Sequence, residues 1–169
     1  MKPWSKSLAL FLCLALILGG LAGCGGAPTA ENDGLQIVAT IFPLYDWAVN
    51  ILGDNPCGAE LSLLLDGSVD MHSYQPSAAD LIAIAESDVF LYVGGESEEW
   101  VDEALAGQSN PHRIVLDLME LLDSAVKEEE RVEGMEADGD EAAAYDEHVW
   151  LSLKNAQTVC AAIADALGR

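Results

Sequence analysis

The sequence has few basic residues. Lysine and arginine together number 7, against 29 aspartates and glutamates, and the formal net charge is −22. Proteins that bind nucleic acids neutralise phosphates with basic side chains, so this balance argues against a nucleic-acid partner. It also disfavours binding to an anionic membrane surface, and it favours a cation as the small partner.

The sequence also lacks an apolar run long enough to cross a membrane. Residues 8–18 (LALFLCLALIL) are apolar throughout, but a spanning helix needs roughly 20 such residues. Lys2 and Lys6 precede this run, and small residues lead from it to Cys24. This pattern is typical of an export signal. A transmembrane anchor that is left uncut is the alternative.

The four residues that end at Cys24 (LAGC) resemble the lipobox of bacterial lipoproteins. The resemblance implies that residues 1–23 are a lipoprotein signal peptide and that Cys24 becomes the lipidated first residue of an extracytoplasmic protein. The two acyl chains carried by such a cysteine suffice for stable anchoring in a lipid bilayer, for which one chain is marginal. Residues 24–34 are then a tether, since most of them are small or polar.

Only two cysteines follow Cys24, and they are Cys57 and Cys160. Outside the cytoplasm such a pair can form a disulfide. The sequence leaves open whether the two pair or stay as thiols.

Alternating strand and helix patterns follow the tether. Four short apolar runs are typical of buried strands, at residues 36–41, 60–65, 89–93 and 114–118. These runs are apolar on both faces, as in a parallel sheet that is covered on both sides. Helical patterns lie between and after them, at residues 44–52, 77–85, 97–105 and 152–167. This order predicts an α/β lobe with a roughly four-stranded parallel sheet flanked by helices.

Serines mark the starts of three predicted helices. Ser77 and Asp80 form a capping box, so we expect Asp80 to cap its helix rather than to bind a metal. Ser97 is expected to cap a helix that stops at Gly107, and Ser152 to cap the last helix.

Histidine is scarce, and two of the three histidines lie where a ligand site is expected. His72 follows the second predicted strand, and ligand sites in α/β sheets form beyond the carboxyl ends of strands. His148 precedes the last helix. Neutral imidazoles are good ligands for Zn²⁺, so the two predict a metal site if folding unites them. Surface or structural roles are the alternative, and His112 is expected to be a turn residue.

Three segments resemble signatures of one protein family. Residues 72–80 (HSYQPSAAD) resemble His-Ser-Tyr-x-Pro-x-x-x-Asp, and residues 146–152 (DEHVWLS) resemble Asp-x-His-Val-Trp-Leu. Residues 92–100 (YVGGESEEW) resemble the strand-to-helix segment between them. With the lipobox, this order and spacing resembles the zinc and manganese solute-binding lipoproteins of ABC importers, and the zinc branch is the closer likeness.

The resemblance implies two α/β lobes that hold the metal in the cleft between them. His72 and His148 match the two histidine ligands of the N-terminal lobe, which would be residues 35–169. The family's other ligands come from a C-terminal lobe that is absent from this sequence, so the chain resembles an N-terminal part. The implied cargo is Zn(II), with Mn(II) as the alternative, and the implied partner is an ABC permease in the membrane. Asp146, Glu147 and Tyr74 are candidates to support the ligands.

The segment 127–147 is strongly acidic and has no histidine. Zinc members of the family often carry a histidine-rich stretch here, so its absence keeps manganese open. We expect this acidic loop to be a solvated spacer, and a cation-attracting loop is the alternative.

Two other classes of function stay open. An exported metal-dependent hydrolase would use His72, His148 and Glu147, but the sequence has no His-Glu-x-x-His or Gly-x-Ser-x-Gly motif, so we predict that the protein is not an enzyme. A surface adhesin for cell adhesion would expose an apolar patch. We expect Trp47, Trp100 and Trp150 to pack in the core instead.

Overall fold

The computed structural model describes residues 34–67, 69–106, 110–128 and 145–168. The predicted signal peptide 1–23, Cys24, nearly all of the tether, Gly107 and most of the acidic loop 127–147 lie outside these residues. The chain divides into two units at residues 32 and 33, and the second, Asp33–Arg169, holds the fold described below. Within the described residues, no helix combines the length and the apolar character that crossing a membrane requires.

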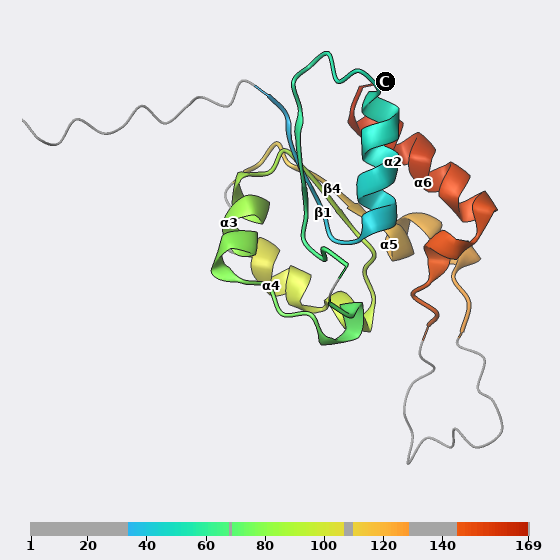
Figure 1. Cartoon of the computed structure of the whole chain (residues 1–169). Coiled ribbons are helices and arrows are strands. Elements are labelled where there is room, and N and C mark those ends of the chain that lie inside the picture. Colours follow the sequence, from blue (N-terminus) through green and yellow to red (C-terminus); the bar gives the residue numbers. More distant parts are fainter. Residues whose placement is uncertain (1–33, 68, 107–109, 129–144, 169) are drawn as a thin grey trace, which may run out of the picture. The chain divides into compact units, whose positions relative to one another are not determined.

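A four-stranded parallel sheet lies at the centre of the second unit (Figure 1). Its strands are β1 (Gln36–Ala39), β2 (Glu60–Leu63), β3 (Val89–Tyr92) and β4 (Ile114–Asp117). Their order is β2-β1-β3-β4, and every neighbouring pair is parallel. Each strand lies inside one of the four predicted runs, so the predicted α/β class and parallel sheet are confirmed.

Helices cover both faces of the sheet, which gives three layers (Figure 1). One face carries α2 (Phe42–Leu52), the short α5 (Leu118–Leu122) and α6 (Leu153–Ala166). The other face carries α3 (Ala78–Glu86) and α4 (Trp100–Ala106).

The alternation of side chains along the central strands explains why both faces are apolar. Along β3, Val89 and Leu91 enter the cluster beneath α2 and α6. Phe90 points the other way and packs with Ile84 of α3 and Val101 of α4. The edge strands differ from the prediction, because they are only partly covered: the side chains of β4 and β2 are half-buried or exposed.

Two of the three predicted serine caps are present. The backbone N–H of Ser77 donates to Asp80 Oδ2 at 2.7 Å, and the Asp80 N–H donates to Ser77 Oγ at 3.3 Å, which completes the capping box of α3. The hydroxyl of Ser152 accepts from the N–H of Asn155 at the start of α6. Asp80 therefore caps its helix, as predicted.

The predicted cap at Ser97 is wrong. Ser97 lies inside a short 3₁₀ helix, η2 (Glu96–Glu98), and α4 begins only at Trp100. The turn tightens here because the buried Glu98 folds back on the end of β3. Its Oε2 accepts from the N–H groups of Val93 and Gly94 at 2.7 and 2.9 Å. The hydroxyl of Ser97 therefore does not cap a helix.

The helix α5 was not predicted, because Leu118 was assigned to the preceding strand. The side chain of Asp117 accepts from the N–H of Glu120 at 2.9 Å, so it ends β4 and caps a helix that starts at Leu118. An Asp with Glu three residues later (DLME) is the signal that sequence reasoning missed.

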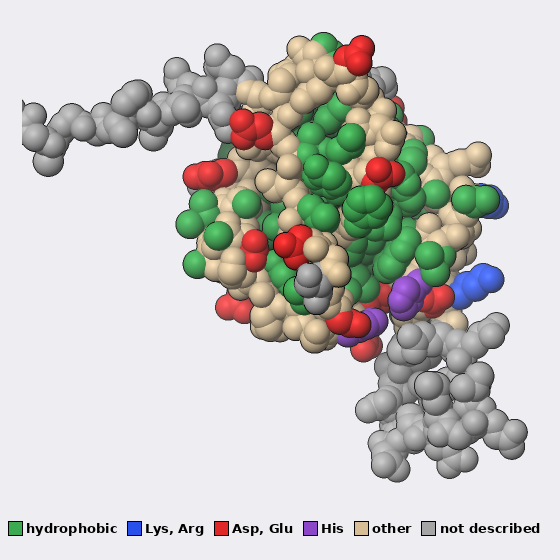
Figure 2. Space-filling model, viewed as in Figure 1, with side chains coloured by type: hydrophobic (Ala, Val, Ile, Leu, Met, Phe, Trp, Pro, Cys, Tyr) green, Lys and Arg blue, Asp and Glu red, His purple; other side chains and the backbone are tan. Residues whose placement is uncertain are grey.

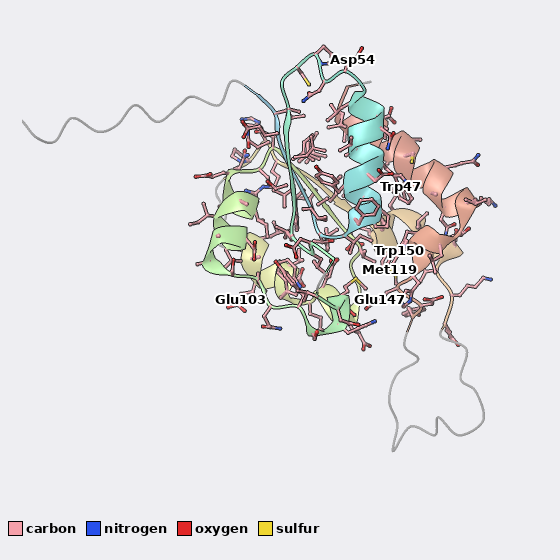
Figure 3. The ribbon with its side chains drawn as sticks, viewed as in Figure 1. Trp47, Asp54, Glu103, Met119, Glu147 and Trp150 are labelled. Atoms are coloured by element: carbon pink, nitrogen blue, oxygen red, sulfur yellow. The ribbon has the colours of Figure 1, made fainter. Side chains whose placement is uncertain are left out.

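Cys160 and three tryptophans lie partly buried in the fold. Cys160 on α6 is a half-buried free thiol, so it forms no disulfide with Cys57. Trp47, Trp100 and Trp150 are partly buried against the core, as expected, and Figure 3 labels Trp47 on α2 and Trp150 near the start of α6. None of the three supplies the exposed patch that an adhesin would need.

Candidate metal centre

The candidate site lies at the carboxyl edge of the sheet. The chain leaves β1 toward β2 on one side and then crosses to β3 on the other, and such a reversal of direction creates a crevice outside the strand ends. His72 lies in the connection that follows β2, and Ser97 lies in the connection that follows β3. Figure 3 places Glu147 at this end of the unit and Asp54, which follows α2, at the opposite end.

His72 sits in a 3₁₀ helix, η1 (Met71–Ser73), whose start is fixed by Asp70. Asp70 Oδ1 accepts from the backbone N–H of His72 at 2.9 Å. The ring nitrogen Nδ1 of His72 lies 2.6 Å from the hydroxyl oxygen of Ser97. His72 is thus held at its backbone by its own loop and at its ring by the next connection.

Tyr74 braces the loop that carries His72. Its hydroxyl donates to Asp80 Oδ2 at 2.9 Å, and its ring packs edge-on against Trp100 at 5.6 Å between centroids. Burial and the hydrogen bond to Asp80 raise the pKa of the Tyr74 phenol. Tyr74 supports the site by tying the loop to α3 and α4.

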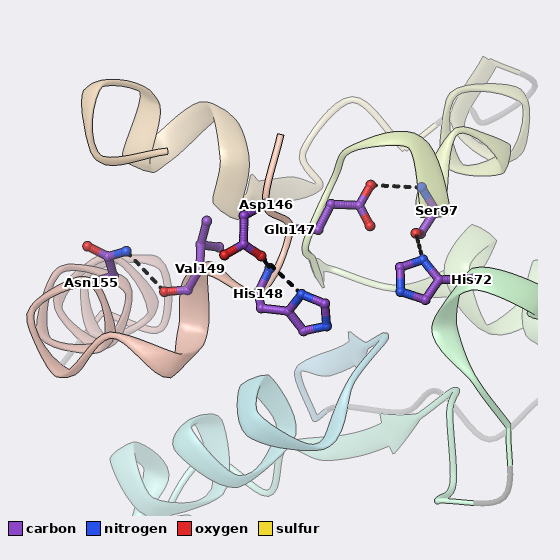
Figure 4. A network of polar contacts seen from close by, with 7 residues as sticks. All are labelled: His72, Ser97, Asp146, Glu147, His148, Val149 and Asn155. Carbon is purple, nitrogen blue, oxygen red and sulfur yellow. Dashed lines mark hydrogen bonds and ion pairs between the residues drawn. The ribbon is translucent and has the colours of Figure 1, made fainter. Parts of the chain in front are cut away.

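His148 is held by a turn of the same design. Asp146 Oδ1 accepts from the backbone N–H of His148 at 2.9 Å and lies 3.0 Å from its Nδ1 (Figure 4). The backbone hydrogen bond from His148, with a further one from its ring, lowers the pKa of Asp146. The next turn, η4 (Val149–Leu151), is fixed to α6 because Asn155 Nδ2 donates to Val149 O at 3.0 Å.

The two ends of the acidic loop are joined next to this turn. Glu128 and Tyr145 form an antiparallel bridge, and the N–H of Asp146 donates to Lys127 O at 2.8 Å. This bridge ends just before His148, so the turn that carries His148 is anchored to α6 on one side and to the bridge on the other.

Folding brings the two imidazoles together across 76 residues of sequence. Their ring centroids lie 6.1 Å apart, with 52° between the ring planes. Two imidazoles that share a tetrahedral zinc at about 2.1 Å would place their centroids about 5 Å apart. Each ring is hydrogen-bonded through Nδ1, so Nε2 is the nitrogen left available to a metal ion, and closing the pair onto one ion would require a movement of about 1 Å.

A hollow of about 260 Å³ adjoins both histidines. Its wall is largely apolar and includes Phe42, Val69 and Trp150. Figure 2 shows histidine side chains at the edge of the molecule, with acidic side chains beside them and apolar side chains above. A cation at this edge would meet imidazoles in a setting of negative charge, which favours its approach.

The sequence of the chain matches the model of one known protein family. The family model described as ZnuA, "Zinc-uptake complex component A periplasmic", matches residues 37–169. The chain belongs to the ZnuA family. The resemblance read from the sequence is thereby confirmed.

Proteins similar in sequence to this chain include a zinc uptake protein and a manganese-binding lipoprotein. The high-affinity zinc uptake system protein ZnuA of Bacillus subtilis is 29% identical over 92% of this chain and 49% of its own length. The manganese-binding lipoprotein MntA of Halalkalibacterium halodurans is 28% identical over 94% of this chain and 47% of its own. This ZnuA-family chain therefore spans about half the length of these relatives.

Solved structures show the same fold. Zn(II)-bound AdcA from Streptococcus pneumoniae is 27% identical, with a TM-score of 0.60 over 79% of this chain and 26% of that chain. FpvC from Pseudomonas aeruginosa, solved in complex with Mn²⁺, is 27% identical, with a TM-score of 0.61 over 79% of this chain and 45% of that chain.

Within the residues that the structure describes, no three His, Cys, Asp or Glu side chains are grouped so that they could hold a metal ion. Two imidazoles are thus what this part of the ZnuA-family chain offers. His112 lies apart in a turn, as predicted, where its N–H donates to Asn110 Oδ1 at 3.1 Å.

Sequence reasoning missed the contact of Ser97 with His72 and the shared design of the two turns. Both histidines follow an aspartate by two residues (DMH and DEH), and both aspartates accept from the histidine N–H. This repeated Asp-x-His spacing predicts a turn at each histidine, because Asp side chains accept hydrogen bonds from the backbone two residues later.

Proposed function

We propose that this chain is the N-terminal metal-binding lobe, residues 35–169, of an extracytoplasmic solute-binding protein that captures Zn(II) and delivers it to an ABC permease. His72 and His148 supply two of the zinc ligands through Nε2. The protein binds and releases its cargo without chemical turnover.

The observation that carries this proposal is the meeting of the two histidines at the carboxyl edge of the sheet. Their centroids lie 6.1 Å apart, and each ring is oriented by a hydrogen bond at Nδ1. Metal-binding histidines are commonly oriented in this way through the nitrogen that faces away from the ion. Membership of the ZnuA family and the zinc-binding relatives support the same reading.

Zinc titration of the full chain tests the two ligands. We expect isothermal titration to show one zinc ion per chain and at least a tenfold loss of affinity in His72→Ala and in His148→Ala. His112→Ala is the matched control, since this histidine is exposed in a distant turn, and it should bind zinc like the wild type. Equal affinity in all four proteins would contradict the assignment.

Manganese is the second candidate, because a manganese-binding lipoprotein is among the relatives. Affinity alone does not separate the two metals, since nitrogen sites favour zinc over manganese in general. X-ray absorption of the loaded protein does: zinc is expected with four ligands near 2.0–2.1 Å, whereas manganese prefers an octahedral set.

We further propose that residues 1–23 are removed and that Cys24 carries the lipid anchor, with residues 24–34 as the tether. The support is the LAGC sequence and the apolar run before it. Mass spectrometry of the membrane-extracted protein should give a chain that starts at Cys24 with a diacylglycerol increment. The same mass in Cys24→Ser, or an uncut N-terminus, would refute the anchor.

A further inference from the structure

A chain of hydrogen bonds joins Glu147 to His72 through Ser97. Glu147 Oε1 accepts from the backbone N–H of Ser97 at 2.9 Å, and the Ser97 hydroxyl lies 2.6 Å from His72 Nδ1 (Figure 4). The three residues come from three separate segments: the turn before α6, the connection after β3, and the loop after β2. None of these contacts is local in sequence.

The Glu147 end of this chain is buried, with 6% of the residue exposed. The carboxylate lies against Gly95, where an added Cβ would collide with Glu147 Oε1. Gly95 has φ +80° and ψ −170°, a conformation that is essentially restricted to glycine. The diglycine turn after β3 therefore makes room for this carboxylate.

The two histidines are oriented by different kinds of group. A carboxylate such as Asp146 can only accept, so it fixes the proton of His148 on Nδ1 and leaves the lone pair on Nε2. A serine hydroxyl can donate or accept, so Ser97 permits either tautomer of His72. When Nε2 of His72 binds an ion, Nδ1 carries the proton and donates to Ser97 Oγ.

We propose that Ser97 is a positioning residue for His72 and that Glu147 acts through it. The Glu147 carboxylate holds the Ser97 N–H, and the Ser97 hydroxyl holds His72 Nδ1 so that Nε2 faces His148. Asp146 and Glu147, adjacent in sequence, thus orient one histidine each. The inference rests on the proposed function, in which His72 and His148 bind zinc through Nε2.

Nitrogen NMR of the full chain, labelled with ¹⁵N-histidine, tests the positioning directly. Long-range ¹H–¹⁵N spectra report the protonation of Nδ1 and Nε2 for each ring. In metal-free protein, Ser97→Ala should move the His72 nitrogen resonances and leave those of His148 in place. Ser73→Ala is the matched control: Ser73 is the neighbour of His72 in η1, but its hydroxyl donates to Asp70 O at 3.2 Å.

Zinc titration gives the functional readout. Ser97→Ala should lower zinc affinity about tenfold, the smaller of the effects usual for groups that orient a ligand. Ser97→Thr, which keeps a hydroxyl, should restore it. Glu147→Ala should reproduce the Ser97→Ala defect at His72, and Glu147→Gln, which keeps an oxygen acceptor for the Ser97 N–H, should recover part of the affinity that Glu147→Ala loses.

The outcomes separate this inference from the proposed function. If zinc moves both histidine spectra but Ser97→Ala changes neither the His72 resonances nor the affinity, the positioning role is refuted and the zinc site stands. If zinc moves neither histidine in the wild type, the zinc site itself is refuted. Thermal unfolding of each variant identifies a loss of affinity that comes from misfolding, and a defect at His72 in a misfolded protein counts against the inference.

Discussion

The buried carboxyl group of Glu98 allows a quantitative test of the turn that carries Ser97. Only 3% of Glu98 is exposed, and its Oε2 accepts from two backbone N–H groups at the end of β3. Burial raises the pKa of Glu98 above its ordinary value of 4.5. The side chain is needed as an acceptor, but its negative charge is unfavourable in this position.

Two substitutions separate these effects. Glu98→Ala leaves two buried N–H groups without their acceptor, and each hydrogen bond to a charged group is worth about 1.5–3 kcal/mol. We expect the free energy of unfolding to fall by about 3 kcal/mol, or about 10 °C in Tm for a unit of this size. Glu98→Gln keeps an oxygen that accepts from both N–H groups, so its stability at pH 7 should equal or exceed that of the wild type.

The pH dependence has a definite sign. Because the pKa of Glu98 is higher in the folded than in the unfolded protein, its contribution to stability is full below its ordinary pKa of 4.5 and is lost as pH rises through the folded pKa. The wild type should therefore lose stability relative to Glu98→Gln across this interval. Urea unfolding followed by tryptophan fluorescence between pH 4 and 8 measures the difference. A difference that is constant with pH, or a glutamine variant as unstable as the alanine variant, would refute the reasoning.

Two further predictions concern the turns that hold the site. Gly95→Ala should lower the free energy of unfolding by about 2–3 kcal/mol, because of the glycine-only conformation and the collision with Glu147. Urea unfolding measures it, and Gly53→Ala, at φ +57° with no atom within 4 Å, should cost clearly less; equal losses would contradict this account. Ser77→Ala should cost about 1 kcal/mol through loss of the α3 capping box, while Ser77→Asn should retain most of it. Thermal unfolding checks both, and an unchanged Tm in Ser77→Ala would show that the cap contributes nothing.

Much of the fold was readable from the sequence because it rests on local patterns. The four apolar runs gave all four strands, and the capping box gave the start of α3 at Ala78. The apolar pattern did not distinguish central from edge strands: IVLDL and VFLYV look alike, yet of these two only the second, in β3, is covered on both faces. The order β2-β1-β3-β4 depends on crossovers that no local pattern encodes.

The site was predictable only in part, for the same reason. The histidines were predicted to be ligands through a resemblance and through their positions near predicted strand and helix ends. The contact of Ser97 with His72 joins residues 25 apart, and that of Glu147 with Ser97 joins residues 50 apart. The local pattern around Ser97 also predicted a helix cap. The hydrogen bonds of Glu98 to the backbone N–H groups of Val93 and Gly94 favour a different turn here. A local reading fails where a buried side chain several residues away decides the turn.

The bridge between Glu128 and Tyr145 has a consequence for protein engineering. Because this pairing joins the chain just before Asp146, a change in the number of residues between 128 and 145 need not displace the turn that carries His148. The entropy of closing a loop grows only by about 0.6 kcal/mol for each doubling of its length. A reporter domain whose own termini lie close together could therefore be inserted between Glu128 and Tyr145 and would be joined to the chain near His148.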